Sequence, residues 1–244
     1  MAGTTAIAND AFSGFYIGAS AGGSFLSGQE DRNFTSTIIG TVTTLRGQTR
    51  EGLRKNSYFG TAFIGYGGFF FCYQPNVFLA TELFVDVANR NDTNSERLST
   101  ANNIDLLNTS SRLNIHPVSW GLDIRPGYKI CDALLYARLG MGLHRITLNH
   151  NNAIFFTPPS SLASSNSKSI DRAVLRLGLG FEHPLCDCLT LRADYIYTYL
   201  GKISTSLSDS RRVVADIPRT QVINSNSQVN LCNNAVMLGL VWHW

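Results

Sequence analysis

Eight segments of alternating apolar and polar residues, joined by connections that are alternately long and short, constrain the fold of this chain most strongly. The segments are Phe12–Phe25, Ser57–Phe71, Val77–Ala88, His116–Ile130, Leu134–Leu148, Asp171–Glu182, Leu189–Ile203 and Leu231–Trp244. In a soluble β-sandwich nothing requires long and short connections to alternate, whereas a membrane barrel has short turns on one side and long loops on the other. The pattern predicts an all-β chain that forms an eight-stranded, antiparallel, up-and-down transmembrane β-barrel.

The domain organisation follows from this pattern. We expect residues 1–11 to form an N-terminal tail and residues 12–244 to form a single barrel. Four long external loops are expected at about 28–56, 89–115, 149–170 and 204–230. Strand-like patches at Thr37–Thr44 and Val213–Ile217 are expected to extend strands above the membrane, and a ten-stranded barrel is the alternative. Because the N-terminus has no basic region followed by an apolar core, we interpret the chain as lacking its signal peptide.

The composition agrees with a barrel in a membrane. Charged residues make up only 15% of the chain, whereas soluble domains contain about 25%. No uninterrupted apolar run approaches the roughly 18 residues that a membrane-spanning helix requires. Low charge without membrane helices favours an integral protein of the bacterial outer membrane. The net charge of +3 is small and scattered, so nucleic acid is not an expected partner.

The charges of the third to seventh segments fall mainly on the face opposite to the apolar one. Five acids and five bases share this face: Glu82, Asp86, Asp123, Glu182 and Asp194, with Arg125, Arg138, Arg172, Arg176 and Arg192. An ion pair separated by about 4 Å gains about 4 kcal/mol at an effective dielectric constant of about 20, whereas an unpaired charge in a confined lumen is costly. An eight-stranded barrel is just wide enough for side chains to fill it. We therefore predict a lumen closed by an ion-pair network; a small porin or ion channel through the charged lumen is the alternative.

The final segment, Leu231–Trp244, is predicted to close the barrel against the first. Every second residue from Val236 to Trp244 is apolar, which gives the strand one lipid-facing side. A soluble protein rarely ends on an unprotected strand that exposes two tryptophans, although the last strand of a soluble sandwich is the alternative. Trp242 and Trp244 fit the aromatic girdle of a membrane barrel.

Three segments and the C-terminus resemble a known family. Asp123-Ile-Arg125-Pro126-Gly127-Tyr128, Leu135-Tyr136-Ala137-Arg138-Leu139-Gly140 and Leu191-Arg192-Ala193-Asp194-Tyr195-Ile196-Tyr197 are similar to segments of the small OmpA-like outer-membrane β-barrel family. The resemblance is specific for architecture and weak for activity, and because we expect a barrel only, it does not imply the cell-wall tether that a peptidoglycan-binding domain would provide. The ending Gly239-x-x-Trp242-x-Trp244 is similar to the signal that such proteins present to the barrel-assembly machinery, although the family more often ends in Phe.

The cysteines gather at the short turns. Cys72, Cys131, Cys186 and Cys188 all lie there, and Cys232 lies in the final segment. In an oxidising compartment Cys131, Cys186 and Cys188 can form a disulfide, within the chain or to a neighbour, and free thiols are the alternative. A metal site is not expected, because Cys-x-Cys with His183 nearby lacks a second pair of ligands.

The histidines do not point to catalysis. His116, His144 and His150 lie toward the outer ends of segments, and no Ser or carboxylate stands at a spacing that makes it a catalytic partner. We predict no enzymatic activity and no cofactor.

Partners are expected at the outer surface. The connection 28–56 is basic through Arg32, Arg46, Arg50, Arg54 and Lys55, partly offset by Glu30, Asp31 and Glu51. These bases can meet phosphates of lipopolysaccharide or host polyanions; a solvated loop is the alternative. The expected partners are outer-membrane lipid and lipopolysaccharide, the barrel-assembly machinery, and an envelope or host component that contacts the loops. The predicted function is therefore structural or adhesive.

Overall fold

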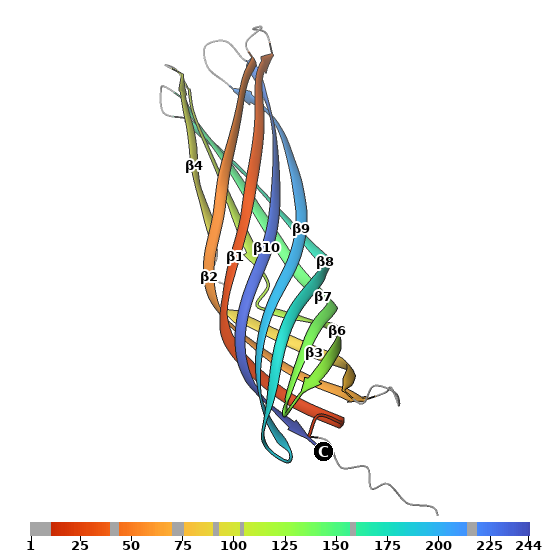
Figure 1. Cartoon of the computed structure of the whole chain (residues 1–244). Coiled ribbons are helices and arrows are strands. Elements are labelled where there is room, and N and C mark those ends of the chain that lie inside the picture. Colours follow the sequence, from red (N-terminus) through yellow and green to blue (C-terminus); the bar gives the residue numbers. More distant parts are fainter. Residues whose placement is uncertain are drawn as a thin grey trace, which may run out of the picture.

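The structure is a computed structural model that describes residues 11–39, 44–69, 76–89, 93–102, 105–156, 160–213 and 219–244. These residues form ten antiparallel strands (Figure 1): β1 (Gly14–Ile39), β2 (Thr44–Phe69), β3 (Val77–Asn89), β4 (Thr93–Asn102), β5 (Asp105–Ile115), β6 (Val118–Ile130), β7 (Ala133–Phe156), β8 (Ser160–Cys186), β9 (Leu189–Val213) and β10 (Arg219–His243). Among the described residues no helix is long and apolar enough to cross a membrane.

Within the described chain, eight of the strands close into a ring. The hydrogen-bonded order is β1, β2, β3, β6, β7, β8, β9, β10 and back to β1. β4 and β5 form a hairpin between β3 and β6, and β5 pairs with the upper part of β7. The eight-stranded, up-and-down barrel predicted from the sequence is confirmed.

The closing strand lies where the sequence placed it. β10 pairs with β1 from Tyr16 opposite His243 to Ile39 opposite Thr220. The backbone N–H of Trp244 also donates to the carbonyl of Phe15 at 3.1 Å. The last strand therefore seals the barrel along the whole length of the first.

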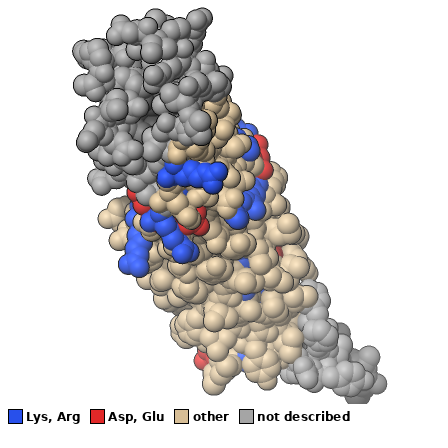
Figure 2. All heavy atoms as spheres, turned by 90° about the horizontal axis from the view of Figure 1, so that it is seen from above, with Lys and Arg blue, Asp and Glu red and all other residues tan. Residues whose placement is uncertain are grey.

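A broad belt of exposed apolar side chains surrounds the ring, and its surface in Figure 2 is nearly free of charge. The rings of Phe15 and Tyr66 pack in a tilted arrangement at the lower edge of this belt, with their centroids 4.9 Å apart. The two consecutive glycines Gly67 and Gly68 form no bulge, because Gly67 pairs in continuous register with both Gly14 and Ala80. β2 therefore keeps one parity throughout, with Phe63 inside and Tyr66 outside.

The upper half of the molecule is strand rather than loop. Within the described residues, the four segments expected as external loops extend the barrel strands. Residues 40–43 and 214–218, which contain most of the two strand-like patches, lie outside the described residues. β8 and β9 cease to pair above Leu175 and Tyr199, and β2 and β3 cease to pair above Tyr58 and Asn89. The barrel consequently divides into two upper sheets: the first contains β9, β10, β1 and β2, and the second contains β8, β7, β5 and β4 (Figure 1).

Candidate functional site: the filled lumen

The lumen is organised around Glu82, a fully buried carboxylate on β3. Its two oxygens accept hydrogen bonds from Arg138 at 3.0 Å, from Arg192 at 2.9 and 3.2 Å, and from Arg125 at 3.3 Å. The hydroxyl of Tyr16 donates to the same carboxylate at 3.3 Å. Three guanidinium groups from three different strands therefore converge on one acid in the centre of the barrel.

The remaining four acids surround this centre. Asp123 lies 3.0 Å from Arg138, and Asp194 lies 2.9 Å from Nε of Arg192. Glu182 lies 2.7 Å from Arg125. The attraction between paired carboxylates and guanidinium groups offsets the cost of removing them from water, which an isolated buried charge would bear without compensation.

Asp86 and Arg176 form the upper edge of the network. Their closest oxygen and nitrogen atoms lie 3.1 Å apart, and the hydroxyl of Thr61 donates to Asp86 at 2.8 Å. The Cζ atom of Arg176 stands 3.5 Å from the centre of the Phe84 ring, a cation–π arrangement. Aromatic rings thus fill the space that the ion pairs leave.

Nine of the ten residues predicted for the network come together, and Arg172 does not join them. Its guanidinium donates to the backbone carbonyl of Lys202, at the level where β8 and β9 separate. Arg172 has the inward parity of β8, but it lies four residues beyond Arg176, the last inward position at which β8 and β9 still pair. There it supplies a hydrogen bond to a carbonyl that has no partner on β8.

Sequence analysis missed five polar partners of the network, one of which is Thr61, described above beside Asp86. Tyr136 donates to Asp194 at 2.7 Å, and Thr190 donates to Glu182 at 2.7 Å. His243 places Nε2 3.1 Å from Glu182, and Tyr16 contacts Glu82 as described above. All of these residues have the inward parity of their strands, so strand parity could have identified them. The prediction of the network used only the charged residues of that parity.

Apolar clusters lie on both sides of the ion pairs. Phe12, Phe78 and Leu134 belong to the cluster at the lower end, next to the short turns. The upper cluster joins the two upper sheets and contains Leu26, Leu53, Leu113, Ile115, Ile146, Leu148, Val174, Leu200, Ile203, Val229 and Leu231. A solute that entered the lumen from either end would have to pass an apolar cluster before it reached the charges around Glu82.

A second buried ion pair lies above the upper cluster. Arg32 donates to Glu30 through Nε at 2.6 Å and through Nη2 at 2.8 Å, and Ser227 donates to Glu30 at 2.7 Å. Arg32 was expected among the exposed bases of the first loop, and that expectation is wrong. The strand period explains the error, since Arg32 shares the inward parity of β1.

The described cysteines are free thiols, and a disulfide among Cys131, Cys186 and Cys188 stays a prediction. Cys131 is the first residue of the turn between β6 and β7 and has a φ of 54°. Desolvation and the neighbouring Cys186 raise the pKa of the Cys188 thiol. Cys72 lies outside the described residues.

The histidines do not assemble into a reactive group in the described chain. His116 is exposed and bonds the backbone of Val118, His144 is buried in the lumen, and the side chain of His150 is outside the description. No group of three or more His, Cys, Asp or Glu side chains in this part of the chain is placed to hold a metal ion.

The apolar belt, the closed ring and the buried charges together define an integral membrane β-barrel with a filled lumen. The sequence profile of the family described as "Outer membrane protein beta-barrel domain" matches residues 1–243. The chain belongs to this outer-membrane β-barrel family. In such barrels the short turns are periplasmic and the long hairpins are extracellular.

Three solved structures illustrate the likeness in fold. Neisserial surface protein A is 12% identical, with a TM-score of 0.42, and the alignment covers 95% of this chain and 98% of that one. Ail of Yersinia pestis, solved with the heparin analogue sucrose octasulfate, is 12% identical, with a TM-score of 0.31 and coverage of 91% and 98%. The toluene transporter TodX of Pseudomonas putida is 10% identical, with a TM-score of 0.19 and coverage of 91% and 90%. The comparison with curated proteins found no match.

Proposed function

We propose that this protein is a closed outer-membrane barrel of structural or adhesive type, whose extracellular sheets contact components of the envelope or of a host. The packing of the lumen is the observation that carries the proposal. Glu82, Arg125, Arg138 and Arg192 are each at most 2% exposed, and they meet in the middle of the barrel. Conduction through this layer would require breaking several buried ion pairs at once, each of which is costly to separate.

Planar-bilayer recording tests the closed lumen. The purified protein is expected to give no defined open states at either polarity. Arg138→Gln is expected to lower the resistance to urea and still to give no conductance, because the apolar clusters above and below remain. Defined open states in the unaltered protein would favour the alternative, a small channel through the charged lumen.

The adhesive part of the proposal is tested on whole cells. Cells that display the full protein are compared with cells that display a variant in which the β1–β2 hairpin is shortened to a turn above Gln29 and Gly52, a register pair. Weaker attachment of the variant to host cells or matrix is expected. If cells that display the two proteins at equal surface density attach equally well, the adhesive role is contradicted and only the structural role of the barrel remains.

The proposal includes two partners within the membrane. Arg54 and Lys202 are exposed basic side chains above the apolar belt, where lipopolysaccharide phosphates would meet them. Trp242 and Trp244 are half or more exposed on the lipid-facing side, where the barrel-assembly machinery would contact them. Replacing both tryptophans with Ala is expected to reduce the yield of inserted barrel in cells more than the same change at Leu238 and Leu240.

A further inference from the structure

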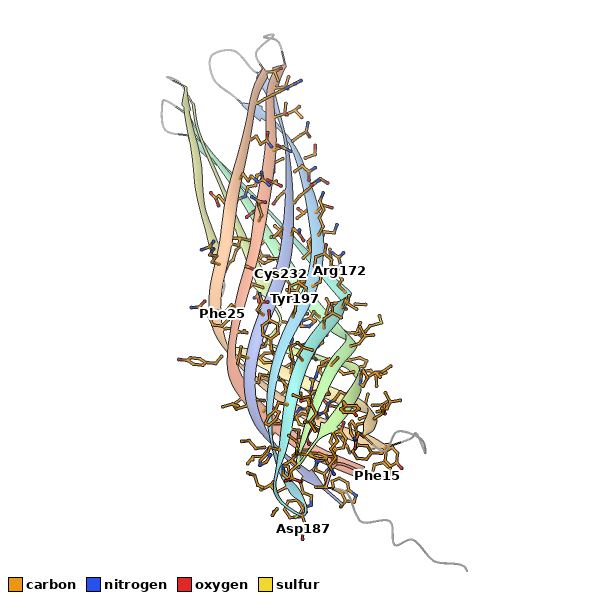
Figure 3. All side chains as sticks on the ribbon, viewed as in Figure 1. Phe15, Phe25, Arg172, Asp187, Tyr197 and Cys232 are labelled. Carbon is orange, nitrogen blue, oxygen red and sulfur yellow. The ribbon has the colours of Figure 1, made fainter. Side chains whose placement is uncertain are left out.

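The outward face of the first upper sheet presents a grid of polar side chains in strict register. Figure 1 shows β9, β10, β1 and β2 running side by side above the belt, and Figure 3 shows their side chains standing out from the ribbon. Across the four strands the rows are Lys202–Asn230–Gln29–Gly52, Ser204–Gln228–Asp31–Arg50, Ser206–Asn226–Asn33–Gln48 and Ser208–Asn224–Thr35–Arg46. We call these four rows the polar face.

The polar face is sorted into columns. β9 contributes serines above Lys202, and β10 contributes only amides. β1 contributes two amides, Gln29 and Asn33, beside Asp31 and Thr35. β2 contributes arginines at every fourth residue: Arg46, Arg50 and, one row below the face, Arg54. Neighbouring strands are about 4.8 Å apart and successive outward residues about 6.7 Å apart along a strand. The result is a regular array of donors and acceptors with a positive edge.

The sheet beneath the polar face is held in place from behind. Glu30, Arg32 and Ser227 are buried on its inward side and hydrogen-bonded to one another. On the outward side Arg50 is oriented by Gln29, which accepts its hydrogen bond at 2.7 Å, and by Asp31 at 3.3 Å. Ser208 donates to Asn224 at 2.7 Å. A ligand would therefore meet an ordered surface.

The chemistry of the polar face selects one class of partner. None of the large exposed hydrophobic side chains of the described residues lies in these rows, whereas protein interfaces are enriched in aromatic residues and Met. Asp31, the one acid of the face, is already paired with Arg50. What remains is a set of amides and hydroxyls, each of which can donate and accept hydrogen bonds, and a net positive charge, since Lys202, Arg46 and Arg50 stand against the single acid Asp31. This combination suits a chain rich in hydroxyl groups that also carries anionic groups.

We propose that the polar face binds an acidic polysaccharide. The amide and serine columns bind the sugar hydroxyls, and Lys202, Arg46 and Arg50 bind its carboxylate or sulfate groups. This inference rests on the proposed function, since it names the partner of the extracellular sheets.

The test measures binding to the full-length protein in nanodiscs of phosphatidylcholine, by biolayer interferometry at physiological salt. The probes are dextran sulfate, uncharged dextran of the same length, and polyphosphate. The variants are R46Q/R50Q and N33A/N226A. The matched controls lie on the second upper sheet. R145Q removes an arginine charge there, as R46Q/R50Q does on the polar face. N114A/T147A removes polar side chains from a cross-strand pair, as N33A/N226A does.

Dextran sulfate is expected to bind at least tenfold more tightly than dextran, and R46Q/R50Q is expected to weaken this binding by about tenfold or more. N33A/N226A is expected to weaken dextran sulfate binding several-fold and to leave polyphosphate binding unchanged, because only the sugar needs the amides. R145Q and N114A/T147A are expected to bind as the unaltered protein does.

Three results would overturn the inference. The first is equal binding of dextran and dextran sulfate. The second is a loss in R145Q as large as in R46Q/R50Q, which would mean non-specific attraction. The third is a concentration-dependent dimer that N33A/N226A abolishes, which would make a second copy of the chain the partner. None of these results affects bilayer conductance, so the closed-lumen proposal stands or falls separately.

Discussion

Glycines and large inward side chains occupy complementary positions in the lumen. In register, Tyr16 faces Gly65, Tyr136 faces Gly180, and Asp123 faces Gly140 across neighbouring strands. A Cβ atom added at each of these glycines would collide with the facing side chain. The glycines therefore provide the room in which rings and charged groups of a narrow barrel can lie across the lumen.

Gly180→Ala is expected to destabilise the barrel by about 1–3 kcal/mol, because the methyl group displaces the Tyr136 ring from its hydrogen bond with Asp194. Urea unfolding in detergent, followed by tryptophan fluorescence, measures the change. Gly23→Ala is the control, since nothing lies within 4 Å of its added Cβ. Equal stability of the two variants would mean that the lumen can repack around an added methyl group.

Glu82→Gln is expected to cost about 3–5 kcal/mol of unfolding free energy, because it leaves several buried guanidinium groups without their common counter-charge. The same urea experiment measures it. Thr81→Val, one residue away on the lipid-facing side, serves as the control and is expected to have little effect. A small effect of Glu82→Gln would show that the aromatic rings alone hold the lumen together.

Much of the lumen could be predicted from the sequence, because strand parity sorts residues into inside and outside. Nine charged residues followed this rule. Arg172 also has the inward parity of β8, yet it does not join the network, because parity does not show where two neighbouring strands stop pairing. Tyr136 and His243 were overlooked since a neutral side chain of inward parity carries no charge pattern to mark it.

At the scale of the strand, one bulge changes which residues face the lumen. Leu200 has no partner on β10, and Gly201 has a φ of +77°. Below the bulge the even-numbered residues of β9 face inward, and above it the odd-numbered residues do, so that Ile203 joins the upper apolar cluster. The sequence showed no signal for this change except Gly201 itself.

Gly201→Ala is expected to destabilise the barrel by about 1–2 kcal/mol, because an L-residue is strained at this φ. The added Cβ would also meet the guanidinium of Arg172 at 2.8 Å. Differential unfolding in urea checks the size of the effect. The double variant Gly201→Ala with Arg172→Ala is expected to recover only the part due to the contact; complete recovery would mean that the backbone is not strained.

The upper strands could not be predicted as strands, for a physical reason. Their outward residues are Ser, Asn, Gln and Thr, and some inward residues, such as Glu30, Ser225 and Ser227, are polar as well. Because these polar residues interrupt the apolar side above the upper cluster, hydrophobic alternation is weak there, and the hairpins are held largely by backbone hydrogen bonds between neighbouring strands. Sequence patterns therefore located the ends of the apolar belt rather than the ends of the strands.

At the scale of the whole molecule, the ring and the upper sheets are separable. The lower barrel closes through β3 and β6, which pair up to Val87 and Val118, while the backbone N–H of Ala88 donates to the carbonyl of Pro117 at 2.8 Å. The β4–β5 hairpin contacts the ring mainly through the upper part of β7. The ion-pair layer lies entirely below this hairpin, on strands of the ring.

Replacing residues 90–116 with a short Gly-Asn turn is therefore expected to leave a folded and closed barrel. The variant should keep the heat-modifiable shift in gel mobility and should show no conductance in planar bilayers. It should unfold at lower urea than the full protein, because the upper cluster loses Leu113 and Ile115. Loss of the gel shift would mean that the hairpin is needed to close the ring, and new open states would mean that the upper cluster, rather than the ion pairs around Glu82, seals the lumen.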